Sequence, residues 1–508
     1  MVADLQRFTG RMARLEGRLQ LQADRSTALA EARAQTTVLV ENLAQALAEL
    51  GARLPEPWEY PAAVEAPPRR WRWVAPLAAL GLVSFGIWQW QLRRAPAPPA
   101  PPVAQVEGLV QDAATGRPIA GARLQYKGIE ASSDAHGRFR LDQPADGSGL
   151  RARAVGYRQA EALARGGGAL LRLEPIEIRA LYFNQDDVGN AEREGRMLRL
   201  IRETGSSAVV LGVKSDSGYL TLRPQHQLAA GIGALAEQPG RDAARLAAAW
   251  KSQGIYTIAL MAVFKDGLLV KARPELALRS AVSKRPIRDA AGVGWADPSI
   301  PLVRDYNLEV ARAAARAGFD EVQFDFIRYP AEALSQEGAT PAENRRRLGV
   351  VSDFLRQAKA ALAPYNVYVS ATVFGSVCAS PEPAAIGQAL EEFSASLDYV
   401  APMLYPSYFQ ADGRFPSPIN YSYKLVKENL ETAARRLGGD RRRLRPWLQN
   451  FPERNGGQAP LEASKIRAQV QAARDAGAGG WMLWDARSTY QHTPEALAGL
   501  GAPLLAGL

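Results

Sequence analysis

The chain has 508 residues, of which 47% are hydrophobic and 22% are charged, a balance typical of a folded protein with several domains. The net charge of +10 comes mainly from arginines scattered along helical stretches, without a nucleic-acid-binding motif, so we expect solvated helix faces and no nucleic-acid partner. A single cysteine, Cys378, excludes an internal disulfide and a cysteine metal cluster.

Residues 1–70 are predicted to form a helical segment on the cytoplasmic side of a membrane. Between Asp4 and Leu50 the sequence has no proline and two glycines, and leucines recur at helical spacing, as at Leu39, Leu43 and Leu47. This pattern fits a coiled coil through which the chain self-associates. It fits equally an amphipathic helix without a partner.

Residues 73–92 predict one transmembrane helix. The stretch from Trp73 to Leu92 carries no formal charge, and about 20 helical residues cover the ~30 Å of hydrocarbon in a bilayer. Tryptophans stand at both ends and arginines flank them, as at membrane interfaces. A buried core helix is the alternative. We therefore expect a single-pass protein anchored in the lipid of a bacterial cytoplasmic membrane, with residues 93–104 as a stiff proline-rich linker.

Residues 105–176 alternate short strand-like runs with turns, and this pattern predicts a small β-sandwich. The segment resembles the carboxypeptidase regulatory-like domain. The residues that carry this resemblance are Gly108, Asp112, Gly116, Pro118, Gly121, Ala122, Asp134, Gly137 and Phe139. The resemblance implies a spacer or a weak carbohydrate or protein contact, so we expect no chemistry here.

Residues 177–508 alternate strand-like runs with helical ones, the signature of βα units. The strand-like runs are IRALYFN, SAVVLGV, YTIALMAVF, EVQFDFI, VYVSATVF, YVAPMLYP, RPWLQNF and GWMLWD. Eight such runs predict a (β/α)8 TIM barrel. Because enzymes with this fold place their sites at the carboxyl ends of the strands, the polar residues that follow the runs are candidate site residues.

Asp325 is the strongest candidate for a catalytic residue. It lies in the apolar run GFDEVQFDFIRYP, where a buried acid needs either a chemical role or a salt bridge, here with Arg328. Hydrolysis of a glycosidic bond commonly uses two carboxyl groups. Asp485 and Asp216 are the other predicted catalytic residues, and Asp266 and Glu382 are further candidates for the second acid. Asp485 fits equally a cap for the final helix.

Sugar binding is predicted for aromatic and polar side chains at the strand ends, because the flat faces of sugars pack against aromatic rings. Core positions are the alternative for about half of the aromatic residues. The predicted substrate-binding residues are Lys214, Lys265, Trp295, Arg328, Tyr329, Tyr405, Tyr408, Gln449 and Trp484. The three histidines, His136, His226 and His492, are scattered and form no ligand motif, so we expect neither a metal nor a cofactor.

From Ile178 onward the sequence resembles the bacterial putative glycoside hydrolase domain family, a group of barrels distantly similar to alpha-amylase-type barrels. The resemblance is carried by VVLGVKSDSGYL, IYTIALMAVFKDGLLVKARPELAL, WADPSIPLVRDYNLEVARAAARAGFDEVQFDFIRYP, SATVFG, IGQALEEFSASLDYVAPMLYPSYF and GGWMLWDA. It implies that Asp325 is the nucleophile and that a second acid lies near the fifth strand. The family tends to have an acidic residue there, and this sequence has Thr372 instead.

The predicted function is hydrolysis of an envelope or exported polysaccharide by carboxylate acid and nucleophile chemistry. Since such polymers lie outside the cytoplasm, we expect the barrel on the periplasmic or extracellular side of the membrane. The alternative is a non-catalytic barrel that binds polysaccharide or acts as a scaffold in envelope or exopolysaccharide assembly, and Thr372 is the main argument for it.

Overall fold

The computed structural model describes residues 105–500, except 144–146, 165–167, 236–240, 332–339, 381–384 and 454–458. The predicted N-terminal helical segment, the predicted transmembrane helix at 73–92 and the whole proline-rich linker at 93–104 lie outside these residues. Among the helices that are described, none combines the length and the apolar character needed to cross a membrane.

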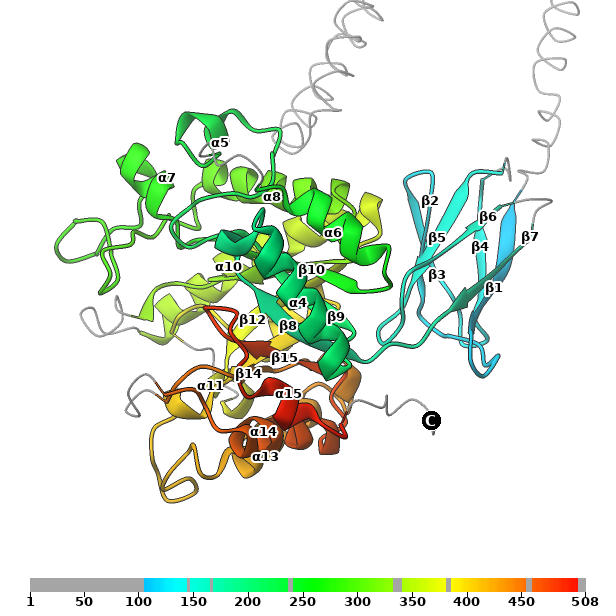
Figure 1. Cartoon of the computed structure of the whole chain (residues 1–508). Helices are drawn as coiled ribbons and strands as arrows, with labels where there is room; N and C mark the ends of the chain where they lie inside the picture. The colour runs from blue at the N-terminus through cyan, green and yellow to red at the C-terminus, as the bar shows by residue number, and fades with distance from the viewer. Residues whose placement is uncertain are drawn as a thin grey trace, which may run out of the picture. The chain divides into compact units, whose positions relative to one another are not determined.

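Residues 106–173 form two small β-sheets that share one hydrophobic core (Figure 1). One sheet has the strand order β4-β1-β7 and the other β3-β2-β5-β6. Their bounds are β1 (Val106–Asp112), β2 (Arg123–Tyr126), β3 (Ile129–Ser132), β4 (Arg138–Leu141), β5 (Gly149–Arg153), β6 (Ala160–Leu163) and β7 (Gly168–Leu173).

The sheet packing explains one of the glycines in this segment. A Cβ atom on Gly108 would lie 2.0 Å from the carbonyl oxygen of Ala169 and 2.5 Å from the ring of Phe139. Only glycine lets the strands come this close. The two sheets agree with the predicted strand pattern, whereas the resemblance to the carboxypeptidase regulatory-like domain stays a prediction.

Eight parallel strands close into a barrel in the order in which they occur in the chain, so the predicted TIM barrel is confirmed. They are β8 (Ile178–Phe183), β9 (Ala208–Lys214), β10 (Tyr256–Ala262), β11 (Glu321–Asp325), β12 (Tyr368–Phe374), β13 (Tyr399–Leu404), β14 (Trp447–Gln449) and β15 (Gly480–Trp484).

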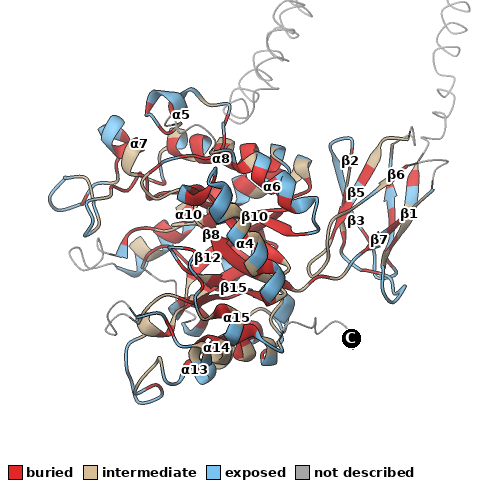
Figure 2. Cartoon of the chain, in the orientation of Figure 1, coloured by how far each residue is buried: buried red, intermediate tan, exposed pale blue. Residues whose placement is uncertain are grey.

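Helices surround the barrel, with buried residues on the side that faces the strands and exposed residues on the other (Figure 2). They are α4 (Ala191–Thr204), α5 (Gln227–Gly231), α6 (Ala243–Lys251), α7 (Gly267–Ala272), α8 (Pro301–Arg316), α10 (Pro341–Leu362), α11 (Ser376–Ala379), α12 (Leu390–Ser396), α13 (Ser422–Arg436), α14 (Ala463–Asp475) and α15 (Thr493–Leu497). The longest of these, α10, begins with Pro341 after Thr340, whose hydroxyl accepts the backbone N–H of Glu343 at 3.2 Å. Proline at the first position and threonine as the cap both favour a helix start.

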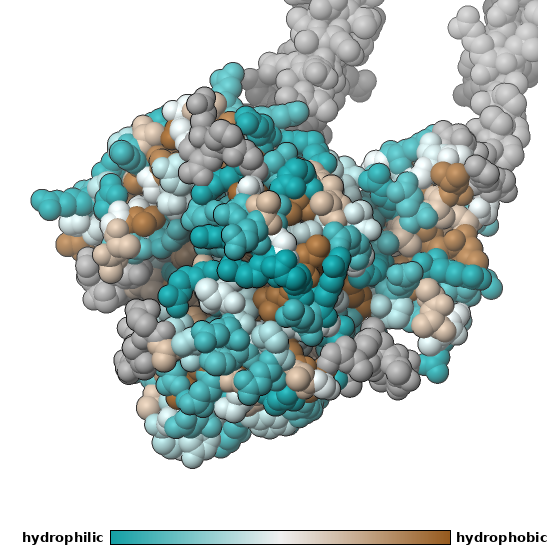
Figure 3. Space-filling view, in the orientation of Figure 1, coloured by the Kyte–Doolittle hydropathy of each residue, from teal (hydrophilic) through white to brown (hydrophobic). Residues whose placement is uncertain are grey.

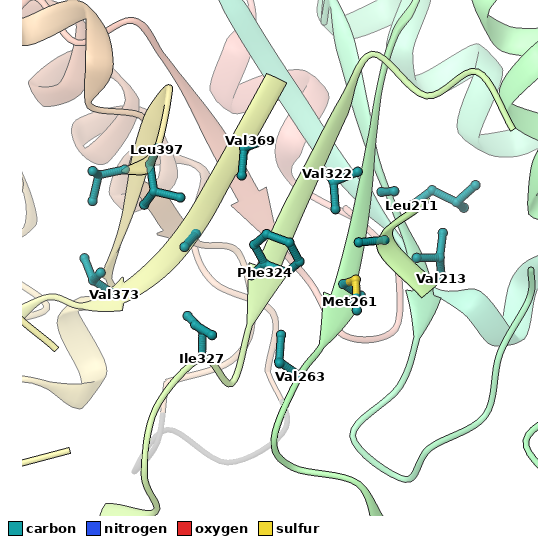
Figure 4. Packing of buried hydrophobic residues seen from close by; sticks show 14 of the residues in the cluster. Leu211, Val213, Met261, Val263, Val322, Phe324, Ile327, Val369, Val373 and Leu397 are labelled. Carbon is teal, nitrogen blue, oxygen red and sulfur yellow. The ribbon is translucent and has the colours of Figure 1, made fainter. Parts of the chain in front are cut away.

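Alternate residues of most barrel strands belong to two different hydrophobic layers, because successive side chains of a strand point to opposite faces. In β10, Met261, which is labelled in Figure 4, packs in the layer between strands and helices. Ala259 belongs to the same layer. Tyr256, Ile258 and Leu260 belong to the layer inside the barrel. The outer surface seen in Figure 3 is mainly hydrophilic, with hydrophobic residues in small separate groups.

Candidate functional site

A cavity of about 840 Å³ lies at the carboxyl ends of the barrel strands. This is in the upper part of the range of ~300–1,000 Å³ that is usual for ligand sites. Charged and aromatic side chains from seven of the strands or their loops line it, among them Tyr182, Asp186, Asp216, Tyr219, Arg241, Asp325, Arg328, Phe374, Tyr405, Tyr408, Phe451 and Trp484.

Asp325, the last residue of β11, lines this cavity with one carboxylate oxygen held in place. Its Oδ1 accepts a hydrogen bond from the hydroxyl of Thr372 at 2.7 Å and from the backbone N–H of Phe326 at 2.8 Å. Its Oδ2 has no hydrogen-bond donor among the residues that the structure describes. Phe326 adopts a φ of 47°, and a strained backbone of this kind occurs often beside functional groups.

The surroundings of Asp325 favour its protonated form. Burial raises the pKa of Asp325 above its ordinary value, and the nearby carboxylate of Asp216 adds to this rise. The hydrogen bonds from Thr372 and Phe326 and the charge of Arg328 lower the pKa, but they only partly offset the effect of burial.

Two groups of aromatic rings face the cavity. In the first, the rings of Tyr182 and Trp484 lie 4.2 Å apart, and Trp447 meets Trp484 edge-on at 5.5 Å. In the second, Tyr405 lies 5.3 Å from Phe451 and 6.1 Å from Tyr408, which is 61% exposed. Both groups offer apolar faces of the kind that sugar rings bind.

Arg328 lies among aromatic rings at the edge of the cavity. Its guanidinium is 4.6 Å from the ring of Phe374 and 4.8 Å from that of Trp295, and it donates a hydrogen bond to the carbonyl oxygen of Tyr329 at 3.0 Å. Trp295 and Tyr329 are themselves buried and do not line the cavity. These two predicted binding residues therefore contact Arg328 on the side away from the cavity and do not themselves reach a ligand in it.

Lys214 ends β9, and its ammonium group is buried away from solvent. It forms an ion pair with Asp266 at 2.8 Å, in which both side chains are fully buried, and it donates a hydrogen bond to Asn307 at 2.8 Å. Burial lowers the pKa of Lys214, while the charge of Asp266 opposes this effect. Lys214 thus joins the loops after β9 and β10 to helix α8.

Lys265 also connects two loops. Its ammonium group lies 2.7 Å from Asp216 and 2.7 Å from Asp289. Burial is the largest single influence on the pKa of Lys265 and lowers it, but the hydrogen bonds and charges of the two carboxylates together outweigh burial, so the pKa is raised. Only Asp216 of these three residues lines the cavity. Lys265 therefore holds a cavity carboxylate in place.

Gln449 and Asp485 are buried beside the cavity and serve the loops around it. Gln449 exchanges two hydrogen bonds with Ser407, at 3.0 and 2.8 Å. Asp485 accepts hydrogen bonds from the loop that follows it, including the backbone N–H of Arg487 at 2.9 Å and the hydroxyl of Thr489 at 2.7 Å. Neither residue lines the cavity.

Seven of the residues predicted from sequence therefore line the cavity and five do not. Those that line it are Lys214, Asp216, Asp325, Arg328, Tyr405, Tyr408 and Trp484. Those that do not are Lys265, Trp295, Tyr329, Gln449 and Asp485. Of the further acid candidates, Asp266 pairs with Lys214, and Glu382 lies outside the described residues.

Sequence reasoning missed several residues that line the cavity, among them Tyr182, Tyr219 and Arg241. Tyr182 could have been found, because it shares its side of β8 with the inward residues Ile178 and Ala180. Tyr219 and Arg241 lie in loops, where no periodicity shows which way a side chain points. In the described part of the chain, no three His, Cys, Asp or Glu side chains come together as a metal site.

The family described as "Putative glycosyl hydrolase domain" matches residues 180–490, which include every barrel strand except the first two residues of β8. The chain belongs to this family. No curated protein matches the chain.

Several solved structures resemble this glycosyl hydrolase domain protein. The glycoside hydrolase domain of PgaB (BpsB) from Bordetella bronchiseptica is 20% identical, with a TM-score of 0.49 over 64% of this chain and 98% of that one. A hypothetical protein from Ruminiclostridium thermocellum is 29% identical, with a TM-score of 0.33 over 38% of this chain and 96% of that one. A class V chitinase from Pseudomonas fluorescens is 13% identical, with a TM-score of 0.40 over 63% of this chain and 98% of that one.

Proposed function

We propose that the barrel is a glycoside hydrolase that cleaves an envelope or exported polysaccharide in the cavity at its strand ends. The observation that carries this proposal is Asp325, an acid with a raised pKa in an aromatic-lined cavity. A raised pKa keeps a carboxyl group protonated at higher pH, as the donor of a proton to the leaving oxygen requires. The role of Asp325 in this proposal is therefore the general acid, in place of the nucleophile that the family resemblance implies.

Asp216 is the second carboxyl group in this proposal. It lines the same cavity, and its charge adds a smaller contribution to the rise in the pKa of Asp325 that burial causes. The ammonium group of Lys265 lies 2.7 Å from Oδ2 of Asp216 and holds this carboxylate in place. Asp216 would act on the other side of the sugar ring, either as the base or as the nucleophile. The cavity also contains Asp186, but an ion pair with Arg241 at 2.8 Å occupies that side chain.

One observation favours a non-catalytic carbohydrate-binding barrel as the second candidate. The β12 side chain that contacts Asp325 is the hydroxyl of Thr372, where the family resemblance leads us to expect an acid. If neither Asp216 nor Asp186 acts on substrate, Asp325 has no second carboxylate among the described residues that line the cavity, and the aromatic cavity would only hold a glycan.

The experiment that separates the two candidates measures release of new reducing ends by the full chain. The substrates are neutral, N-acetylated, amine-bearing and uronate-bearing bacterial polysaccharides, and the variants are Asp325→Asn and Asp216→Asn. Asp305→Asn, on the exposed side of α8, is the matched control. We expect release by the wild-type protein and the control, and a loss of roughly 10²–10⁴-fold in each cavity variant. Glycan binding without release by the wild type would instead support the binding barrel.

We also propose that the barrel works outside the cytoplasmic membrane, anchored by residues 73–92. The uncharged stretch with tryptophans at both ends supports this proposal, as does the location of the proposed substrates. Membrane fractionation, followed by protease digestion of intact spheroplasts, tests it. Digestion of the barrel only after lysis would contradict the proposed orientation.

A further inference from the structure

Two exposed tyrosines line the cavity at opposite sides. Tyr219 lies in the loop after β9 and is 42% exposed, and Tyr408 lies after β13 and is 61% exposed. In the closed barrel, three strands separate β9 from β13 in either direction, so these two strands lie opposite each other. Both tyrosines reach solvent and also line the cavity, so each of these two sides carries a partly exposed ring at the rim of the cavity.

The proposed catalytic acid lies between the two tyrosines. Strand β11, which ends in Asp325, is midway between β9 and β13 on one side of the barrel, and β15, which ends in Trp484, is midway on the other. A ligand that touches both Tyr219 and Tyr408 must therefore cross the cavity between Asp325 and Trp484.

The loop that carries Tyr219 is held by hydrogen bonds and by close packing. The backbone of Tyr219 makes two hydrogen bonds with Ser215, one to its N–H at 3.0 Å and one from its own N–H to the hydroxyl at 3.1 Å. Gly218 adopts a φ of 102°, and a Cβ atom there would lie 2.3 Å from Asp266. The ion pair between Asp266 and Lys214 thus lies directly against this loop.

The segment that carries Tyr408 is held in a similar way. It is a single 3-10 turn, η6 (Pro406–Tyr408), and the buried Gln449 binds both the backbone N–H and the hydroxyl of Ser407. The ring of Tyr408 packs against Tyr405 and Phe451. Two aromatic surfaces that are fixed before binding can hold a ligand at a low cost in conformational entropy.

We infer that the cavity binds the interior of a glycan chain, with Tyr219 and Tyr408 as outer sugar-binding positions on opposite sides of the bond that is cleaved. This inference rests on the proposed function for the cleavage, which would then occur inside the polymer and not at its ends. A site for chain ends needs a closed side to stop the terminal sugar, and both sides here carry an exposed ring.

The test measures how binding depends on the length of the glycan, with full-length Asp325→Asn protein so that no ligand is consumed. Chitooligosaccharides and cellooligosaccharides, from disaccharide to octasaccharide, are the probes, together with oligosaccharides of any polymer that the wild-type protein hydrolyses. Tyr219→Ala and Tyr408→Ala are each added to this background. The matched control is Tyr421→Ala, since Tyr421 is 43% exposed in the same loop region as Tyr408 but does not line the cavity.

We expect affinity to rise with length beyond the trisaccharide. Each cavity tyrosine variant should bind the octasaccharide roughly three- to tenfold more weakly, which corresponds to ~0.6–1.4 kcal/mol, the size of one aromatic contact. Each should bind the disaccharide as before. The control should bind both as before. The first products that the active protein releases should be long oligosaccharides.

The remaining outcomes separate the inference from the proposed function. Affinity that stops rising at the disaccharide, or hydrolysis that releases only mono- or disaccharides from the start, would overturn the inference and leave the hydrolase proposal standing. Length-dependent binding without hydrolysis would support the inference and count against the proposed chemistry. Absence of binding to every probe would overturn both.

Discussion

The buried ion pair between Lys214 and Asp266 gives the sharpest test of how the cavity is built. Asp266→Asn removes one charge, while an asparagine can still cap α7 through the hydrogen bond that Asp266 Oδ1 accepts from Leu269 at 2.9 Å. The ammonium group of Lys214 would then remain fully buried without an opposite charge. An uncompensated buried charge of this kind costs ~3–5 kcal/mol.

The expected change in melting temperature follows from the size of the barrel. At about 2.1 cal/mol/K per residue, a unit of about 330 residues unfolds with an entropy of ~0.7 kcal/mol/K. A loss of ~3–5 kcal/mol therefore lowers Tm by about 4–7 °C. Lys214→Met should cost a similar amount, because it leaves the carboxylate of Asp266 buried without its partner.

A double-mutant cycle shows whether the two residues act as a pair. In the variant with both Lys214→Met and Asp266→Asn no buried charge remains, so its Tm should lie closer to that of the wild type than either single variant does. Thermal unfolding followed by circular dichroism measures all four proteins. The reasoning fails if Asp266→Asn unfolds within about 1 °C of the wild type, or if the effects of the single variants add up in the double variant.

Two further predictions concern the chemistry and the loops of the cavity. Thr372→Val removes a hydrogen bond that lowers the pKa of Asp325, so the pKa should rise. Since a general acid must be protonated, the decline of kcat/KM at high pH should move to higher pH. An unchanged profile would exclude Asp325 as that acid. Gln449→Ala removes both side-chain hydrogen bonds to Ser407, so binding of long oligosaccharides should weaken as in Tyr408→Ala, although Gln449 touches no sugar. Equal weakening for disaccharides in the same titration would contradict this explanation.

The sequence identified the barrel because the fold depends on a local pattern. Eight strand-like runs separated by helical runs can bury their apolar faces in few ways, and β10 shows how closely the residues follow this rule, with alternate side chains in two layers. The same pattern indicated Asp325, since a carboxylate at the end of an apolar strand is visible in the sequence itself.

The direction of each side chain at the strand ends could not be predicted in this way. Lys214 and Asp216 are two residues apart, yet the carboxylate lines the cavity while the ammonium group points to Asp266, a residue of the next loop. A charged side chain that becomes buried needs an opposite charge beside it. The folded chain can supply this charge from a residue that is far away in the sequence.

Asp485 and Tyr219 also show that the sequence does not predict which way a side chain near a strand end points. The oxygens of Asp485 are bound by the backbone and hydroxyl groups of its own loop, and Asp485 does not cap the final helix as the alternative from the sequence had it, because His492 is the cap residue of α15. Tyr219 becomes significant only because the closure of the barrel places β9 opposite β13. The sequence by itself determined the fold and the most prominent acid, through periodicity and burial, whereas the tertiary structure decided which strand-end residues face the cavity, because that depends on contacts between loops that are distant in the chain.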